Sequence, residues 1–162
     1  MIRKCYIKDE GCMKLKDKVA IIIGASGGIG KAIAELFDKE GAKIIAVAGH
    51  NKEKVQRIVK GIRSVGGDAL SMMCDVSDEA QVERIVHKTL IAYRQNDKIV
   101  NSAGIIGPTE PIEKIEADDW DRAFQINVKG MFLCAKHCIP VMVKQGHGNI
   151  INLSSTAGFR GS

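Results

Sequence analysis

A glycine-rich segment, Gly24-Ala-Ser-Gly-Gly-Ile-Gly30, follows a short apolar run and precedes a stretch of helical periodicity. Glycines let a backbone turn sharply and come close to a ligand, and the free N–H groups at the start of a helix attract negative charge. The segment is therefore typical of a turn that binds the pyrophosphate of a dinucleotide. Its spacing, G-x-x-x-G-x-G, differs from the common G-x-G-x-x-G fingerprint, and an ordinary glycine-rich turn is the alternative for this motif alone.

Polar residues also stand where other apolar runs end, at Asp75, Asn101 and Ser154-Ser155. Taken one at a time they have plain structural explanations, because Asp, Asn and Ser are common in turns. Asn127 is harder to explain in this way, since it lies in an apolar helical stretch where a buried amide needs hydrogen-bond partners. These residues stand at the carboxyl end of a predicted strand or in the helix that follows it.

The remaining pattern supplies the elements that must hold these residues. Short apolar runs alternate with helical periodicity, and no repeat or linker divides the chain. The order β-α-β-α-β-α-β-α-β predicts one α/β domain, a doubly wound parallel sheet with helices on both faces. The predicted strands are Val19–Ile23, Ile44–Val47, Ala69–Cys74, Lys98–Asn101 and Asn149–Leu153.

Local signals predict where the helices begin and end. Ser77 is the expected N-cap of the third helix. A long helix is expected from about Asp118 to Lys144, with Pro140 kinking or ending it locally. The apolar positions that recur at helical spacing in the first helix are Ile29, Ile33, Leu36 and Phe37.

From about Leu15 to the last residue, five ordered motifs resemble those of the short-chain dehydrogenase/reductase family. The glycine segment is similar to the cofactor loop, Asn101-Ser-Ala-Gly104 to the N-N-A-G motif with Ser102 replacing its second Asn, and Asp75-Val76 to the adenine contact. The resemblance implies a Rossmann-like domain that binds NAD or NADP. The cofactor-binding residues it implies are Gly24, Ser26, Gly28, Ile29, Gly30, Asp75, Val76, Asn101, Ala103 and Gly104.

The same resemblance implies hydride transfer between the nicotinamide cofactor and a small carbonyl or secondary alcohol substrate. Ser155 would be the catalytic Ser that polarises the substrate oxygen, and Asn127 would hold a water in the proton relay. The family's general acid/base is a Tyr followed four residues later by a Lys that lowers its pKa. No Tyr-x-x-x-Lys occurs in the 162 residues.

We therefore expect an oxidoreductase fold that is truncated after about the fifth strand and inactive as it stands. The alternative is a dinucleotide-binding or subunit-interaction module without catalysis. The segment Val47-Ala-Gly-His-Asn-Lys52 favours NADP modestly over NAD, because NAD-specific members typically carry an Asp there, and His50, Asn51 or Lys52 could contact a 2′-phosphate. Gly27 stands where many NADP-binding members carry a basic residue, so a turn that accepts either cofactor is the alternative.

Composition excludes several other classes of protein. Apolar residues make up 45% and charged residues 27%, which excludes a disordered chain. The net charge is +5, but the Lys and Arg residues are interleaved with Asp and Glu along the chain, and aromatic residues make up only 4%. No nucleic-acid partner is therefore expected. The apolar runs are too short to span a membrane. Five cysteines without a C-x-x-C pair favour buried thiols in a cytoplasmic protein with no metal site, although Cys134, His137 and Cys138 lie close together.

Two further expectations concern the ends and the surface. Residues 1–14 are expected to be a frayed extension, without the apolar core of a secretory signal, and 15–162 the NAD(P)-binding domain. The long helix carries more apolar residues than one core-facing stripe requires, and its equivalent in the family commonly packs on its own copy. We therefore expect the full-length parent to form a homo-oligomer.

Overall fold

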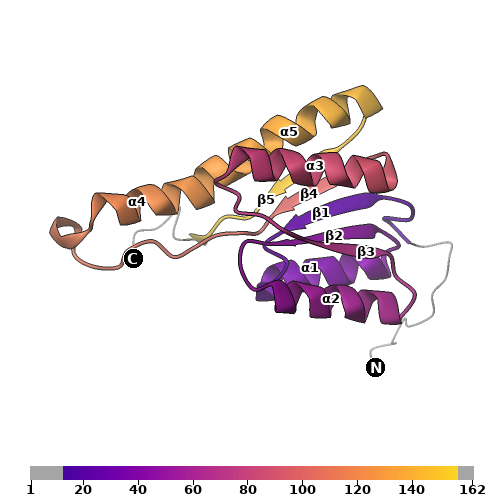
Figure 1. The fold of residues 1–162 in the computed structure, drawn as a ribbon, viewed down its shortest axis with the longest axis horizontal. Helices are drawn as coiled ribbons and strands as arrows, with labels where there is room; N and C mark the ends of the chain where they lie inside the picture. The colour runs from indigo at the N-terminus through magenta and orange to yellow at the C-terminus, as the bar shows by residue number, and fades with distance from the viewer. Residues whose placement is uncertain (1–12, 157–162) are drawn as a thin grey trace.

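The computed structural model describes residues 13–156, so the predicted extension lies outside it apart from Met13 and Lys14. Within this range one sheet of five parallel strands has the order β3-β2-β1-β4-β5 (Figure 1). The prediction of a doubly wound parallel sheet is confirmed. The strands are β1 (Val19–Ile23), β2 (Lys43–Ala48), β3 (Ala69–Met73), β4 (Lys98–Asn101) and β5 (Asn149–Asn152).

Helices cover both faces of this sheet. The first two helices lie on one face, and the third lies on the other beside the long helical segment (Figure 1). Their bounds are α1 (Gly28–Lys39), α2 (Lys52–Ser64), α3 (Glu79–Tyr93), α4 (Ala117–Phe124), the π-helix η2 (Gln125–Lys129) and α5 (Gly130–Gln145), with a short 3-10 turn η1 (Ile112–Lys114) before α4.

Strand β1 shows how the sheet holds two separate cores. Val19, Ile21 and Ile23 belong to the core under α3 and α5, whereas Ala20 and Ile22 belong to the core under α1 and α2. A strand buried on both faces has no need of polar alternation. The continuous apolar run in the sequence therefore marks the central strand.

Helix α1 packs against the sheet through small side chains. Gly30 and Ala34 are its buried residues, whereas Ile29 is 63% and Leu36 is 55% exposed. Of the four apolar residues that recur at helical spacing, only Ile33 and Phe37 pack against the core under α1 and α2. A Cβ on Gly30 would overlap the carbonyl group of Gly24, so the start of α1 lies close to the end of β1.

The structure also corrects two predictions about the helices, the N-cap of α3 and an end of the long helix at Pro140. Asp78, not Ser77, caps α3, because its carboxylate accepts a hydrogen bond of 3.2 Å from the backbone N–H of Gln81. Pro140 does not end the long helix, because α5 continues through it to Gln145, and a local kink at Pro140 stays a prediction. The long helical segment also contains an irregular turn, η2, whose backbone carries the wider turns of a π-helix.

At the amino ends of the strands, one carboxylate joins several segments. Asp97 is 1% exposed and accepts hydrogen bonds from the backbone N–H of Val19 at 2.8 Å and the Gln95 side chain at 3.0 Å. It also forms an ion pair with Lys18 at 3.3 Å, and its Oδ1 lies within hydrogen-bond distance of His147 Nε2 at 2.8 Å. The start of β1 is thus tied to the loops that precede β4 and β5.

Strand β5 is the edge of the described sheet on the side of β4. Ile150 packs against the core under α3 and α5, but Ile151 is 41% exposed on the other face. Among residues 13–156, only β4 pairs with β5. This edge and face are the least covered part of the sheet.

Two sequence predictions concern the long helical segment and the cysteines: that no apolar run spans a membrane, and that the chain has no metal site. Ala117–Gln145 is the single run in the described range that is long and apolar enough to cross a membrane by length and composition. Its inner side nevertheless belongs to the α3-side core, through residues such as Leu133 and Met142. Cys74, Cys134 and Cys138 are buried free thiols, and no group of three or more potential metal ligands occurs in residues 13–156.

Candidate dinucleotide-binding site

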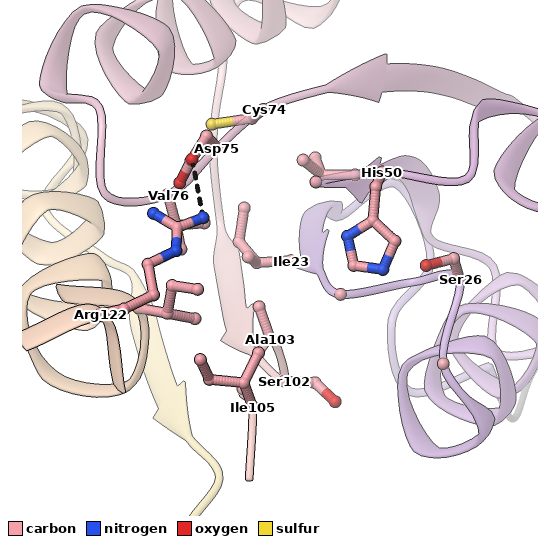
Figure 2. Close-up of a pocket in the computed structure, with 16 residues that line it drawn as sticks. Ile23, Ser26, His50, Cys74, Asp75, Val76, Ser102, Ala103, Ile105 and Arg122 are labelled. Atoms are coloured by element: carbon pink, nitrogen blue, oxygen red, sulfur yellow. Dashed lines mark hydrogen bonds and ion pairs between the residues drawn. The ribbon is translucent and has the colours of Figure 1, made fainter. Parts of the chain in front are cut away.

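A pocket of about 370 Å³ opens at the carboxyl ends of β1, β2 and β4 (Figure 2). From β1 the chain proceeds to β2 on one side, and only later to β4 on the other side. Such a reversal of strand order leaves a crevice at the strand ends, where ligands bind in open α/β sheets. The pocket therefore lies where the fold alone would place a ligand.

Six of the ten predicted cofactor-binding residues line this pocket; they are Gly24, Ser26, Asp75, Val76, Ala103 and Gly104. The other four lie close by. Gly28 lines an adjoining groove, Ile29 is exposed at the start of α1, and Gly30 is buried beneath the loop. Asn101 is 2% exposed within β4.

Gly24 allows the loop to pass close to β4. Its φ is +81°, and a Cβ atom at this position would lie 2.6 Å from the backbone nitrogen of Ala103. A Cβ on Gly30 would in turn overlap the carbonyl group of Gly24. Only glycine fits at both positions, so the first turn of α1 packs directly on the end of β1.

The start of α1 suits a phosphate group. Gly27 precedes the helix without a side-chain cap, and the first turn holds no acidic residue. Its backbone N–H groups and the helix dipole therefore favour an anion at this point. A glycine cradle and a helix start beside a pocket are the features that a bound pyrophosphate requires, so these residues fit a dinucleotide cofactor.

Asp75 lies at another wall of the pocket, with both carboxylate oxygens engaged (Figure 2). Oδ1 accepts hydrogen bonds from the Ser77 hydroxyl at 2.6 Å and from its backbone N–H at 3.0 Å. Oδ2 accepts one from Arg122 Nη2 at 3.1 Å. The Ser77 hydroxyl is the main cause of a lowered pKa for Asp75, and Arg122 adds to it. Asp75 therefore carries its charge at neutral pH.

Arg122 was missed by sequence reasoning. It lies on α4, 47 residues after Asp75, and no motif relates the two positions. His50, Gly49 and Ile105 also line the pocket without having been proposed as cofactor contacts on the basis of the resemblance. His50 was considered only for a 2′-phosphate, and it lines the pocket together with Ser26 (Figure 2).

Asn127 lies in η2 and reaches the loop after β4. Its Oδ1 accepts a hydrogen bond from the N–H of Ile105, and its Nδ2 donates one to the carbonyl of Ile105, both at 2.9 Å. Asn127 is half-buried and is not among the residues that line the pocket, whereas Ile105 is. The predicted need of this amide for hydrogen-bond partners is confirmed.

Ser155 follows β5 and is exposed. The strand that leads to it is joined to β4 by a hydrogen bond of 2.7 Å from Asn101 Nδ2 to Asn152 Oδ1. The carbonyl oxygen of the Asn101 side chain is buried without a hydrogen-bond partner among the described residues. Asn101 thus supports the two strand ends from inside the sheet.

The pocket wall contains one thiol, that of Cys74, and it is unreactive. Burial raises the pKa of the Cys74 thiol to about 12, and the nearby Asp75 contributes to the increase. The thiolate is the nucleophilic form of cysteine, so Cys74 stays unreactive at neutral pH. The pocket offers hydrogen bonding and charge instead of a covalent nucleophile of this type.

A family model described as short chain dehydrogenase matches residues 18–162. The chain belongs to this family. An uncharacterised oxidoreductase of Thermotoga maritima is 42% identical over 149 residues, which are 92% of this chain and 58% of that protein. A 3beta-hydroxysteroid dehydrogenase of Mediterraneibacter gnavus is 36% identical over 148 residues, 91% of this chain and 53% of that protein.

Solved structures of similar proteins agree with this assignment. A metagenomic short-chain oxidoreductase in complex with NADP is 32% identical, with a TM-score of 0.86 over 91% of this chain and 66% of that one. An NAD+-bound xylitol dehydrogenase is 32% identical, with a TM-score of 0.87 over 92% of this chain and 57% of that one. The chain thus spans little more than half the length of the curated relatives named above.

Proposed function

We propose that this chain is the dinucleotide-binding part of an NAD(P)-dependent oxidoreductase that acts on a carbonyl or secondary alcohol group. The observation that carries the proposal is the glycine loop, which holds the start of α1 at the reversal point of the sheet, opposite a charged Asp75. When bound, the nicotinamide cofactor would supply or accept the hydride. Ser155 would donate a hydrogen bond to the substrate oxygen and so polarise it.

We further propose that the 162-residue chain binds the cofactor without turning it over. The chain holds no Tyr-x-x-x-Lys pattern, so it lacks the general acid/base that the family employs. Adding NADPH with a simple cyclic ketone should give no change in absorbance above the uncatalysed rate.

Binding itself is the direct test of the proposed function. Calorimetry with NADP and NAD should show saturable binding of at least one of them, and nicotinamide mononucleotide alone should bind far more weakly because it lacks the adenosine half. Gly24→Ala, whose added Cβ would meet the backbone of Ala103, should lose binding. Absence of saturation by either dinucleotide at millimolar concentration would overturn the proposal.

We infer a preference for NADP from the charges around the glycine loop. A groove of about 500 Å³ adjoins the pocket at Ser26 and Gly27, and Lys31, Lys54 and Arg57 line it together with a single acidic residue, Glu35. No carboxylate follows β2 before Glu53 to repel a 2′-phosphate. Asn51 is occupied in capping α2, where its side chain accepts from the N–H of Lys54.

The preference is tested by measuring both dissociation constants at one ionic strength, because salt screens exposed charges. Replacing Lys54 and Arg57 by Met should weaken NADP binding roughly threefold to tenfold, as expected for two exposed charge contacts, and leave NAD binding unchanged. Lys60→Met, an exposed cation of α2 outside the groove, is the control. Tighter binding of NAD than of NADP by the unaltered chain would contradict the preference.

We propose that a second copy of the chain covers the outer side of the long helical segment. Exposed apolar side chains recur along it every four residues at Trp120, Phe124, Val128 and Phe132, and exposed residues continue to Val143. Asp118, Asp119 and Asp121 lie at the start of this stripe, whereas Lys129 lies near its middle and Lys144 at its other end. Two antiparallel copies would bring opposite charges together, which supports a homo-oligomer.

We also infer a cytoplasmic location. The buried thiols Cys74, Cys134 and Cys138 are unpaired in a structure with no need of cross-links. Proteins of oxidising compartments more often use cysteines as disulfides. The free thiols therefore favour a reducing compartment.

A further inference from the structure

Arg122 makes two hydrogen bonds across the mouth of the pocket. From α4 its Nη2 donates to Asp75 Oδ2 and its Nη1 donates to the Ser77 hydroxyl oxygen, both at 3.1 Å. The three side chains form a closed ring, because Ser77 also donates to Asp75 Oδ1. A guanidinium presents its N–H groups in a rigid plane, so this contact fixes the orientation of the carboxylate as well as its charge.

The ring leaves one accepting position on Asp75. Each carboxylate oxygen has two lone pairs. Those of Oδ1 are both taken by Ser77, through its N–H and its hydroxyl, and one of Oδ2 is taken by Arg122. The remaining lone pair belongs to Oδ2, and its direction is set by Arg122. A carboxylate in this state can only accept, so it selects a ligand group that donates.

The ion pair is poorly placed to serve stability alone. The side chains of Arg122 and Asp75 are 47% and 39% exposed. Exposed ion pairs of this kind contribute little to folding free energy. Both residues line the pocket, and Figure 2 shows the guanidinium lying against the carboxylate at its wall. The contact therefore acts where a ligand would be recognised.

We propose that Arg122 is a positioning residue for base recognition, holding Asp75 so that Oδ2 accepts a hydrogen bond from the 6-amino group of adenine. The proposal rests on the proposed function, since it requires that a dinucleotide occupies the pocket. Hypoxanthine carries an oxygen at the same ring position, which would face the carboxylate without a proton. The oriented Asp75 should therefore discriminate between the two bases.

The test measures dissociation constants of the 162-residue chain for NAD and for its hypoxanthine analogue by calorimetry. We expect the unaltered chain to bind NAD at least about tenfold more tightly, the ratio typical of a hydrogen bond to a charged group. Arg122→Met should lower this ratio to about twofold or less, chiefly by weakening NAD binding. Arg122→Lys should recover part of it, because Lys keeps the charge without the planar fork.

Two further variants separate positioning from a general effect. Arg84→Met removes an exposed arginine of α3 outside the pocket lining and should keep the full ratio. Asp75→Asn should lose the ratio, and adding Arg122→Met to it should cause no further loss, since the Arg would act through Asp75. Additive losses in the double variant would contradict this order of action.

The outcomes decide between the alternatives. An unchanged ratio in Arg122→Met, or an equal weakening of both ligands, would overturn the proposal and leave Arg122 a structural role. If Arg122→Met does not fold, Arg122→Lys decides in the same way, because an unchanged ratio in that variant contradicts a role for the fork. If the unaltered chain binds neither dinucleotide, the proposed function fails together with this inference. Binding without discrimination rejects the inference alone.

Discussion

Asn127 satisfies both backbone polar groups of Ile105 with the two ends of one amide. The two hydrogen bonds are each 2.9 Å long and join η2 to the loop after β4 across 22 residues. Because the amide donates and accepts at once, only one orientation of the Asn side chain fits. The contact therefore fixes the loop at the pocket wall to the helical segment behind it.

The first prediction concerns this contact. Asn127→Asp replaces the donating NH₂ by an acceptor that faces the carbonyl of Ile105, so we expect a loss of about 1–3 kcal/mol in the free energy of unfolding. Urea denaturation measures the loss. Gln125→Glu makes the same chemical change two residues away at an exposed position and should cost far less. Equal losses in the two variants would show that the two hydrogen bonds between Asn127 and Ile105 do not contribute specifically to the free energy of unfolding.

The second prediction separates the glycines of the loop. Gly24→Ala should prevent stable folding or abolish dinucleotide binding, because its Cβ would meet the backbone of Ala103 and its φ is +81°. Gly28→Ala should keep the fold, since a Cβ there meets nothing within 4 Å. Gly61→Ala, in the interior of α2 and equally open, should raise stability by about 0.5–1 kcal/mol. Thermal unfolding of the three variants checks this order.

The third prediction concerns acid stability. Burial alone would raise the pKa of Asp97, but hydrogen bonds from Val19, His147 and Lys18 outweigh it and hold the pKa below its ordinary value. A group whose folded pKa is lowered adds stability above its unfolded pKa of about 3.9, and this stability is lost as the pH falls through the folded pKa. Asp97→Asn should therefore be less stable at neutral pH by about 1–3 kcal/mol.

The pH profile distinguishes this effect from simple damage. Below about pH 4 the gap in unfolding free energy between Asp97→Asn and the unaltered chain should narrow, because the carboxylate that Asn replaces becomes protonated. Asp121→Asn, an exposed change of the same type, should leave the profile unaltered. A constant gap across the whole range would contradict the role given to Asp97.

The fourth prediction tests the proposed second copy. Phe132 is 60% exposed in the middle of the apolar stripe, so Phe132→Glu should shift the sedimenting species towards the monomer. Val65→Glu alters a residue that is 66% exposed at the end of α2 and should leave the mass unchanged. A monomeric unaltered chain at micromolar concentration would count against the second copy. Binding of the chain to lipid vesicles that is lost in Phe132→Glu would assign the stripe to a membrane surface instead.

Much of the fold was predictable because a strand that is buried on both faces is visible in the sequence as a continuous apolar run. The runs Val19–Ile23 and Lys98–Asn101 coincide with β1 and β4, and the run of β1 is apolar throughout because that strand is buried on both faces. Helix detail was less predictable. Asp78 is the N-cap of α3, whereas the Ser77 hydroxyl donates a hydrogen bond to Asp75. This arrangement depends on side-chain contacts and not on propensity. Ile29 and Leu36 share the helical spacing of Ile33 and Phe37, yet they are exposed and only Ile33 and Phe37 pack against the core.

Some residues of the site were likewise predictable from chain order, whereas others depend on tertiary contacts. Gly24 and Asp75 were found because their positions relative to strand ends follow from chain order, and the structure places both at one pocket. Arg122 was not found, since its contact with Asp75 depends on how α4 crosses the strand ends. The hydrogen-bond partner of Asn127 likewise could not be predicted from the sequence. The need for a partner is local, but its identity as the backbone of Ile105 is tertiary.

The π-helical turn at Gln125–Lys129 constrains the number of residues in this stretch. An α-helix rotates by about 100° per residue, so removing one residue from a wide turn restores regular winding and rotates everything before it against everything after it. With Leu133 held in the core and Asn127 bound to Ile105, both ends of the turn are fixed. Deleting Val128 would satisfy one end only by releasing the other. This part of the chain should accept changes of side chain far more readily than a change of length.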